Sequence, residues 1–413
     1  MRKIITLLVT AGLAGACLAQ EDADTWNLGD IYPSVEAWSK AKNALEADLD
    51  KIDQCQGHLG DSAAKLFECS ELLSDTVKTY SRISSYAGMA ADADTRDADT
   101  QRRRTEVQIL GGKLTEKVSF IDPEVLEIGE EKLKGFMSSL AALEPYRHGI
   151  EDTLRQSRHV LDAEGEAIMA ATSMMRRQPS NTYRTLANAD MPWPTITLSN
   201  GEEVRLDQSA YTKYRSVDNR DDRQAVFESF WGKWKEYERT MGTTLAGQVN
   251  VQIFNHRQRN YANSLSASLG RNAIPESVYR TLIAETNENL DTLHRYFRLR
   301  GRMLGIDDLR YFDIYPSLVE TDMKFPIAIG KQLTLEAVAP LGSAYTEVMS
   351  SGFDSRWMDV YPRPGKRSGA YMNGSVYDVH PYVLMNYNDD YESVSTLAHE
   401  WGHAMHSNLA NQN

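Results

Sequence analysis

Long apolar runs, cysteines and clustered basic residues are all scarce in this sequence. Apart from a short stretch near the N-terminus, no segment is apolar enough to cross a membrane. The formal net charge is −13, and a chain this acidic lacks the clustered basic surface that nucleic-acid binding requires. With 41% hydrophobic and 25% charged residues over 413 positions, the composition is that of a globular protein of two or more domains.

The first 19 residues have the layout of a secretory signal peptide. Arg2 and Lys3 precede a short apolar segment, and Ala19 offers a cleavage site before Gln20 and the acidic Glu21 and Asp22. We therefore expect an exported, periplasmic protein with no stable membrane span after cleavage. An uncleaved anchor is the alternative, but the apolar segment is short for a span of roughly 20 residues.

Three cysteines allow two further predictions. A lipid attached at Cys17 is a less favoured alternative to simple cleavage, because Ala14 stands where bacterial lipoprotein signals usually have leucine. Cys55 and Cys69 would remain after cleavage in an oxidising compartment, where they could form one disulfide between neighbouring helices. Two unpaired, partly buried thiols fit the sequence equally well.

Apolar residues recur at helical spacing through most of the chain. One face of a first helix carries Trp38, Leu45 and Ile52, and Ser34 can cap its start. The same spacing predicts further helices over residues 66–83, 97–118, 221–257, 275–304 and 330–349. Short Gly/Asp turns between the first of these helices favour an array of antiparallel helical hairpins.

Two short β elements interrupt this helical pattern. Alternating residues on both sides of Asn200-Gly201 predict a β-hairpin over residues 195–206. Residues 382–387 form a short, apolar and β-prone segment, and we interpret them as a strand at the edge of a sheet. Asp390 then provides the start of a final helix over residues 391–409.

The final helix contains the sequence His399-Glu400-Trp401-Gly402-His403. Residues four apart leave the same face of a helix, so both histidines can bind one zinc ion. Glu400 lies next to the first of them and can act as general base toward a metal-bound water. Because the chain has only nine histidines, this pattern is improbable by chance. The alternative is a helix that carries two surface histidines and a glutamate and binds no metal.

His406 is not expected to be the third zinc ligand. It lies about 10.5 Å along the helix axis from His399, whereas a zinc–nitrogen bond is only about 2.1 Å long. We expect it to lie beside the metal site, to face substrate or to be structural. Gly at position 406 and His at position 409 would indicate a metzincin, but the chain has His406 and Leu409. The ten residues after His403 contain no carboxylate that could complete the site.

The sequence resembles oligoendopeptidase F, in the thimet-oligopeptidase-like M3 family of zinc metallopeptidases. The most specific run is TLAHEWGHAMH, residues 396–406, supported by residues 361–371 and 379–387. Weaker similarity at residues 26–34, 92–97 and 119–121 extends the resemblance over nearly the whole mature chain.

The resemblance implies a mainly α, two-lobed metallopeptidase fold around a deep channel that admits short unstructured peptides. It implies one Zn²⁺ on His399 and His403, with Glu400 as the base. The family's third ligand is a glutamate on a later helix, and its substrate-binding histidine and tyrosine also come later. None of these has a counterpart here, so we expect an incomplete catalytic domain. Tyr371, Asn386 and Tyr387 are expected around the metal or facing the substrate.

This comparison divides the chain into a signal peptide (1–19), an N-terminal helical domain (20–190) and the first part of an M3 catalytic domain (191–413). The expected function is zinc-dependent hydrolysis of short peptides, with little activity from this chain alone. An inactive fragment, or one part of a split enzyme that needs a separate C-terminal portion, is one alternative. A helical peptide-binding or scaffold protein of the cell envelope is another, but it leaves the two histidines and the glutamate unexplained.

Overall fold

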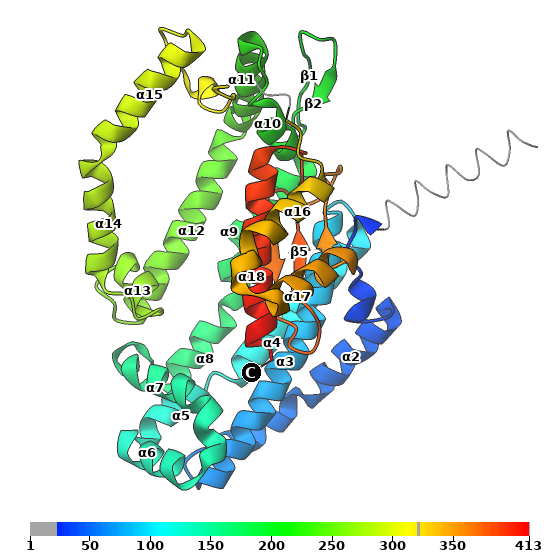
Figure 1. Cartoon of the computed structure of the whole chain (residues 1–413). Coiled ribbons are helices and arrows are strands. Elements are labelled where there is room, and N and C mark those ends of the chain that lie inside the picture. Colours follow the sequence, from blue (N-terminus) through cyan, green and yellow to red (C-terminus); the bar gives the residue numbers. More distant parts are fainter. Residues whose placement is uncertain (1–22, 320–322, 413) are drawn as a thin grey trace, which may run out of the picture.

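The computed structural model describes residues 23–319 and 323–412, and the fold is mainly helical, as the sequence predicts (Figure 1). The expected signal peptide and Cys17 lie outside the described residues. Within the described ranges, no helix combines the length and apolar character needed to span a bilayer. The helices are α2 Val35–Asp48, α3 Ala63–Ala93, α4 Ala98–Lys117, α5 Ile121–Ile128, α6 Glu130–Ser139, α7 Arg147–Arg155, α8 Ala163–Ala171, α9 Ser173–Thr185, α10 Gln208–Tyr214, α11 Arg220–Glu236, α12 Glu238–Gln258, α13 Ser264–Gly270, α14 Glu276–Glu288, α15 Leu290–Leu304, α16 Ile327–Val338, α17 Ser343–Asp354 and α18 Tyr391–Ala410.

Helices α2 to α7 enclose an apolar core of their own. Ser34 caps α2 by accepting from the Ala37 N–H, and Trp38 donates from its indole N–H to the carbonyl of Ile83 on α3 at 3.0 Å. Ile52 is fully buried in a 3₁₀ segment, Leu49–Cys55, that follows α2. A disulfide joins Cys55 to Cys69 on α3, with their Cα atoms 5.8 Å apart.

Three predicted helices are each two helices in the structure. The helix expected over residues 221–257 breaks at Tyr237, whose N–H donates to Trp234 O three residues back and so tightens the last turn of α11. The helix expected over 275–304 breaks at Asn289. The helix expected over 330–349 breaks where Pro340 precedes Gly342, whose φ of 98° is unsuited to a helix.

The β-hairpin is confirmed: β1 (Thr195–Thr197) pairs antiparallel with β2 (Glu203–Arg205). The strand predicted within residues 382–387 is present, but its predicted position at the edge of a sheet is wrong. Strand β5 (Tyr382–Leu384) is the central strand, parallel to β3 (Met358–Asp359) and antiparallel to β4 (Tyr371–Asn373). All three β5 residues are buried. Its partners are too short to give a sequence signal, so the sequence could not place β5 at the centre.

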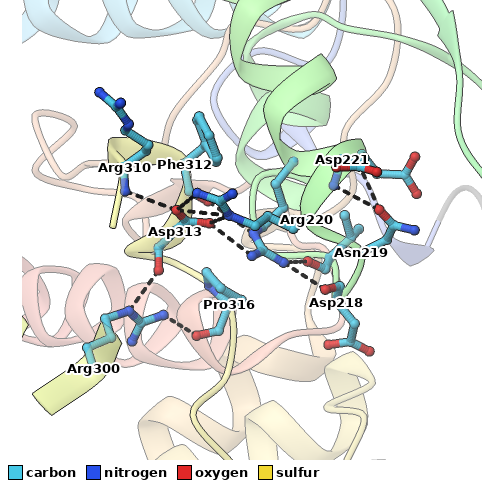
Figure 2. A network of polar contacts seen from close by, with 12 residues as sticks. Asp218, Asn219, Arg220, Asp221, Arg300, Arg310, Phe312, Asp313 and Pro316 are labelled. Atoms are coloured by element: carbon cyan, nitrogen blue, oxygen red, sulfur yellow. Dashed lines mark hydrogen bonds and ion pairs between the residues drawn. The ribbon is translucent and has the colours of Figure 1, made fainter. Parts of the chain in front are cut away.

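Helices α13, α14 and α15 form an outer arm, seen at the left of Figure 1. Its α15 end is held by a polar cluster around Asp313, which is fully buried (Figure 2). The Asp313 carboxylate accepts from Arg220 Nη2 at 2.9 Å and from Arg223 Nη2 at 3.1 Å, both on α11. Its backbone carbonyl accepts from Arg300 Nε on α15 at 2.9 Å. Charged groups therefore join the arm to α11.

Residues 24–31 lie against the C-terminal sheet, although the strands of that sheet come much later in the sequence. The Asn27 N–H donates to Arg356 O, and the Val360 N–H donates to Asp24 O, each at 2.9 Å. The Tyr382 hydroxyl on β5 donates to Asn27 O, also at 2.9 Å. This N-terminal segment therefore completes the layer that carries β5.

Candidate metal and peptide site

Helix α18 presents its two faces to different surroundings. Asp390 caps the helix by accepting from the Ser393 N–H at 2.7 Å. Leu397 and Trp401 are fully buried, and the Trp401 ring lies parallel to Trp357 with ring centroids 5.9 Å apart. The Trp401 ring can pack closely against α17 because residue 352 is a glycine. A Cβ at this position would lie 2.7 Å from the ring. With that face fixed, the opposite face, bearing the motif histidines, is exposed.

His399 and His403 converge on a single point. Their Nε2 atoms are 3.1 Å apart, and their rings are nearly perpendicular at 83°. Two nitrogens bound to one tetrahedral zinc at about 2.1 Å would be separated by roughly 3.4 Å. The pair therefore fits as two ligands of a zinc ion with little rearrangement.

The described residues do not supply a third ligand to this pair. Within residues 23–319 and 323–412, no three His, Cys, Asp or Glu side chains are grouped so that they could hold a metal ion. His406 is exposed on α18, one turn beyond His403. The two converging nitrogens are thus a partial donor set.

Of the two histidines and the glutamate of the motif, Glu400 is the one that is largely buried, with 9% of its surface exposed. Among the described residues its carboxylate has no hydrogen-bond or ion-pair partner. It follows His399 directly on α18. A carboxylate without a competing partner beside a metal-binding pair is free to accept a proton.

The other predicted site residues have different surroundings. The Asn386 side-chain amide donates to Gly369 O at 2.7 Å and lines a large cavity. The Tyr371 hydroxyl donates to Asp92 Oδ2 at 2.9 Å, and burial and that carboxylate raise the pKa of Tyr371 well above its usual value. Tyr387 does not face a substrate, because it is 1% exposed and its hydroxyl donates to Phe325 O at 2.7 Å. Its side chain belongs to the core beneath α18.

The large cavity has a volume of about 1160 Å³ and opens beside the first turns of α18. Thr396 and Asn386 line one side of it, and aromatic residues from α10 and α11 line the other, namely Tyr211, Phe230, Trp231 and Trp234. Sequence reasoning did not single out these aromatics as site residues. The dense aromatic run over residues 227–237 was the available signal, but it also fits a core helix.

An ion cluster fixes the loop that borders this cavity. Asp359 on β3 is fully buried and accepts from Lys366 Nζ at 2.6 Å and from both terminal nitrogens of Arg363. Burial lowers the pKa of Lys366 to about 8, although Asp359 opposes that shift. The cluster holds residues 363–370 at the cavity wall, and no local sequence pattern indicates it.

Comparison with known proteins agrees with this architecture. The model for peptidase family M3 matches residues 213–413, and a model described as oligopeptidase F matches residues 124–192. The oligopeptidase PepF of Bacillus subtilis is 35% identical over 93% of this chain and 57% of its own length. The group B oligopeptidase PepB of Streptococcus agalactiae is 33% identical over 95% of this chain and 65% of its own.

A solved structure shows the same fold. The oligoendopeptidase-F of Enterococcus faecium superposes with a TM-score of 0.68 at 30% identity, over 77% of this chain and 61% of that one. Residues 213–413 therefore carry a domain of peptidase family M3, and the relatives named here are oligopeptidases or an oligoendopeptidase of the F type. The chain spans between 57% and 65% of the length of the two bacterial relatives named above.

Proposed function

We propose that this chain carries the zinc-binding motif and part of the peptide channel of an endopeptidase that hydrolyses short, unstructured peptides. The observation that carries the proposal is the convergence of His399 Nε2 and His403 Nε2 to 3.1 Å beside Glu400. The related oligopeptidases support the substrate class. A cavity of about 1160 Å³ with aromatic walls is large enough for a peptide segment.

In this proposal His399 and His403 hold a zinc ion through their Nε2 atoms. When bound, zinc lowers the pKa of a water molecule and polarises the scissile carbonyl. The Glu400 carboxylate would take a proton from the attacking water and deliver it to the leaving amine nitrogen as the peptide C–N bond breaks. Asn386 and the loop fixed by Lys366 shape the wall along which the peptide lies. Completion of the zinc coordination requires a ligand outside the described residues.

Zinc binding tests the metal half of this proposal directly. We expect the chain to bind zinc, and His399→Ala to weaken its affinity by about 10-fold to 100-fold or more, because one of two nitrogen ligands is lost. Titration calorimetry and metal analysis after dialysis measure this. His294→Ala is the matched control, because His294 is exposed on the arm. Equal zinc binding by wild type and His399→Ala would contradict the assignment of His399 as a zinc ligand.

The catalytic half is tested on quenched fluorescent peptides. Any turnover should fall about 10²-fold to 10⁴-fold in Glu400→Gln, because the general base is lost while zinc binding remains.

The competing function is a helical peptide-binding or scaffold protein, favoured by the apolar cavity alone. That function predicts peptide binding without stoichiometric zinc and without any effect of His399→Ala.

We also propose that the protein is exported. The disulfide between Cys55 and Cys69 supports this, because disulfides persist in oxidising compartments and are rare in the cytosol. Expression of the full sequence in a bacterium with an outer membrane, followed by fractionation and intact-mass measurement, tests it. A periplasmic product lacking residues 1–19 is the expected result, a lipid-bearing mass would indicate Cys17, and a cytoplasmic full-length product contradicts export.

A further inference from the structure

A second, polar cavity of about 350 Å³ lies between α3, α4, α9 and β4. Four arginines line it, Arg104, Arg177, Arg184 and Arg367, whereas Asp92 is its one carboxylate. Four guanidinium groups against one carboxylate leave a formal surplus of three positive charges. The whole chain has a net charge of −13, so this concentration of positive charge is against the overall trend.

Asp92, which is already counted in that balance, has both of its oxygens engaged by other groups. It is 4% exposed and accepts from Arg367 Nη1 at 3.0 Å and from the Tyr371 hydroxyl at 2.9 Å. Arg104 also donates to its other oxygen. Asp92 therefore joins α3 to α4 and to the C-terminal layer, and its contacts account for Arg104 and Arg367 as structural residues.

Arg184 and Arg177 form no ion pair among the described residues, although Asp92 lies near enough to Arg184 to oppose the lowering of its pKa. Arg184 Nη2 donates to the neutral Asn181 Oδ1 at 3.0 Å, and among the described residues neither arginine has an acidic partner. Burial, together with the nearby charges of Arg104 and Arg367, lowers the pKa of Arg184. A partly buried guanidinium without an anion is costly, and a planar carboxylate is its best geometric match.

The position of Arg177 connects this cavity with the peptide channel. Arg177 lines both the polar cavity and the large aromatic one. Arg177 and Arg184 lie seven residues apart on α9, about two turns, and so share one face of that helix. A peptide in the larger cavity can therefore place a carboxylate beyond Arg177 and against Arg184.

We propose that Arg184, assisted by Arg177, binds a carboxylate of the peptide that occupies the larger cavity. This rests on the proposed peptide-binding function, but not on zinc or on hydrolysis. The carboxylate can be the C-terminus of the peptide or an acidic side chain, which share the same chemistry. A charge-assisted bidentate contact of this kind would select peptides by charge and register rather than by the residues at the cleaved bond.

Peptide binding measured by fluorescence anisotropy tests the proposal. A labelled peptide is prepared with a free or amidated C-terminus, each with either Asp or Asn at an internal position. The Glu400→Gln variant is used throughout so that no form is cleaved. Loss of the recognised carboxylate should weaken binding about 10-fold to 100-fold. Sensitivity to amidation identifies the C-terminus, and sensitivity to Asp→Asn identifies a side chain.

Adding Arg184→Gln should reduce that discrimination to less than about twofold, whereas Arg184→Lys should keep part of it. Arg298→Gln, an exposed arginine on α15, is the charge-matched control and should change nothing. Circular dichroism of each variant verifies the fold.

Equal binding of all four peptides would overturn the proposal, as would no binding up to about 1 mM or competition by inorganic phosphate without any peptide preference. Binding is measured both with and without added zinc. A failure of the metal assignment can therefore be distinguished from a failure of carboxylate recognition.

Discussion

The N-terminal helices and the outer arm are built from similar amphipathic sequences but are packed in opposite ways. In the N-terminal region, Ile52, Leu133 and Leu143 are fully buried, and a disulfide crosses the same core. In the arm, α14 buries no residue and α15 buries only Arg300 and Gly301. Large apolar side chains of the arm are exposed instead, namely Val278, Leu282, Leu293, Tyr296 and Met303.

The difference shows that an apolar stripe predicts a helix but not what covers it. Three-residue and four-residue spacing gives the same sequence signal whether the stripe meets a core or solvent. Exposed stripes of this size are typical of surfaces that contact other protein. In the described structure, the α15 end of the arm is held by the charged cluster around Asp313.

The largest expected effect comes from removing the centre of that cluster. Asp313→Ala leaves the guanidiniums of Arg220 and Arg223 without their carboxylate, which should weaken the attachment of the arm by about 3 to 5 kcal/mol. Hydrogen–deuterium exchange over residues 276–304 should then rise strongly, while residues 35–155 stay protected. Asp291→Ala, an exposed aspartate on the arm, is the control. Unchanged exchange in the arm would show that the cluster does not hold it.

The same cluster should respond to acid. Burial raises the pKa of Asp313, but hydrogen bonds from Arg220, the Arg310 N–H and Arg223 outweigh this and leave it below its usual value. A carboxyl whose pKa is lower when folded stabilises the structure above its unfolded pKa of about 4, and this contribution is lost as the pH falls. Exchange in the arm should therefore increase on acidification in wild type more than in Asp313→Ala.

A pair of apolar truncations gives the next, slightly smaller contrast. Ile52→Ala creates a cavity in the N-terminal core and should cost about 2 to 5 kcal/mol of unfolding free energy. Leu282 is 65% exposed on α14, so Leu282→Ala should change it by less than about 0.5 kcal/mol. Urea denaturation of both variants measures the contrast. A comparable loss in Leu282→Ala would mean that the arm is packed in solution.

The sequence predicted local features of this molecule well and distant contacts poorly. The final helix, expected over residues 391–409, spans Tyr391–Ala410, because both its cap and its apolar stripe are local signals. The proximity of His399 and His403 was predictable for the same reason, since helix periodicity alone brings the two side chains together. The hairpin was likewise fixed by Asn200-Gly201 at its turn.

The features that were missed depend on residues far apart in sequence. Asp92 meets Arg367 across 275 positions and Tyr371 across 279, so no local pattern reveals the arginine-lined cavity. The central position of β5 depends on partner strands of two and three residues. The inward orientation of Tyr387 depends on its contact with Phe325, 62 positions away.

The segment of residues 24–31 has a consequence for the order in which the molecule assembles. Arg356 donates to the carbonyl of Thr25 across 331 positions, and closing so long a loop is slow and entropically unfavourable before other contacts exist. During synthesis the helices up to α7 can collapse around their own core while residues 24–31 still lack the sheet that they cover. The first described residues of the chain are thus among the last to reach their final place, and a translation pause before residue 356 would leave Trp26 and Ile31 exposed to chaperones.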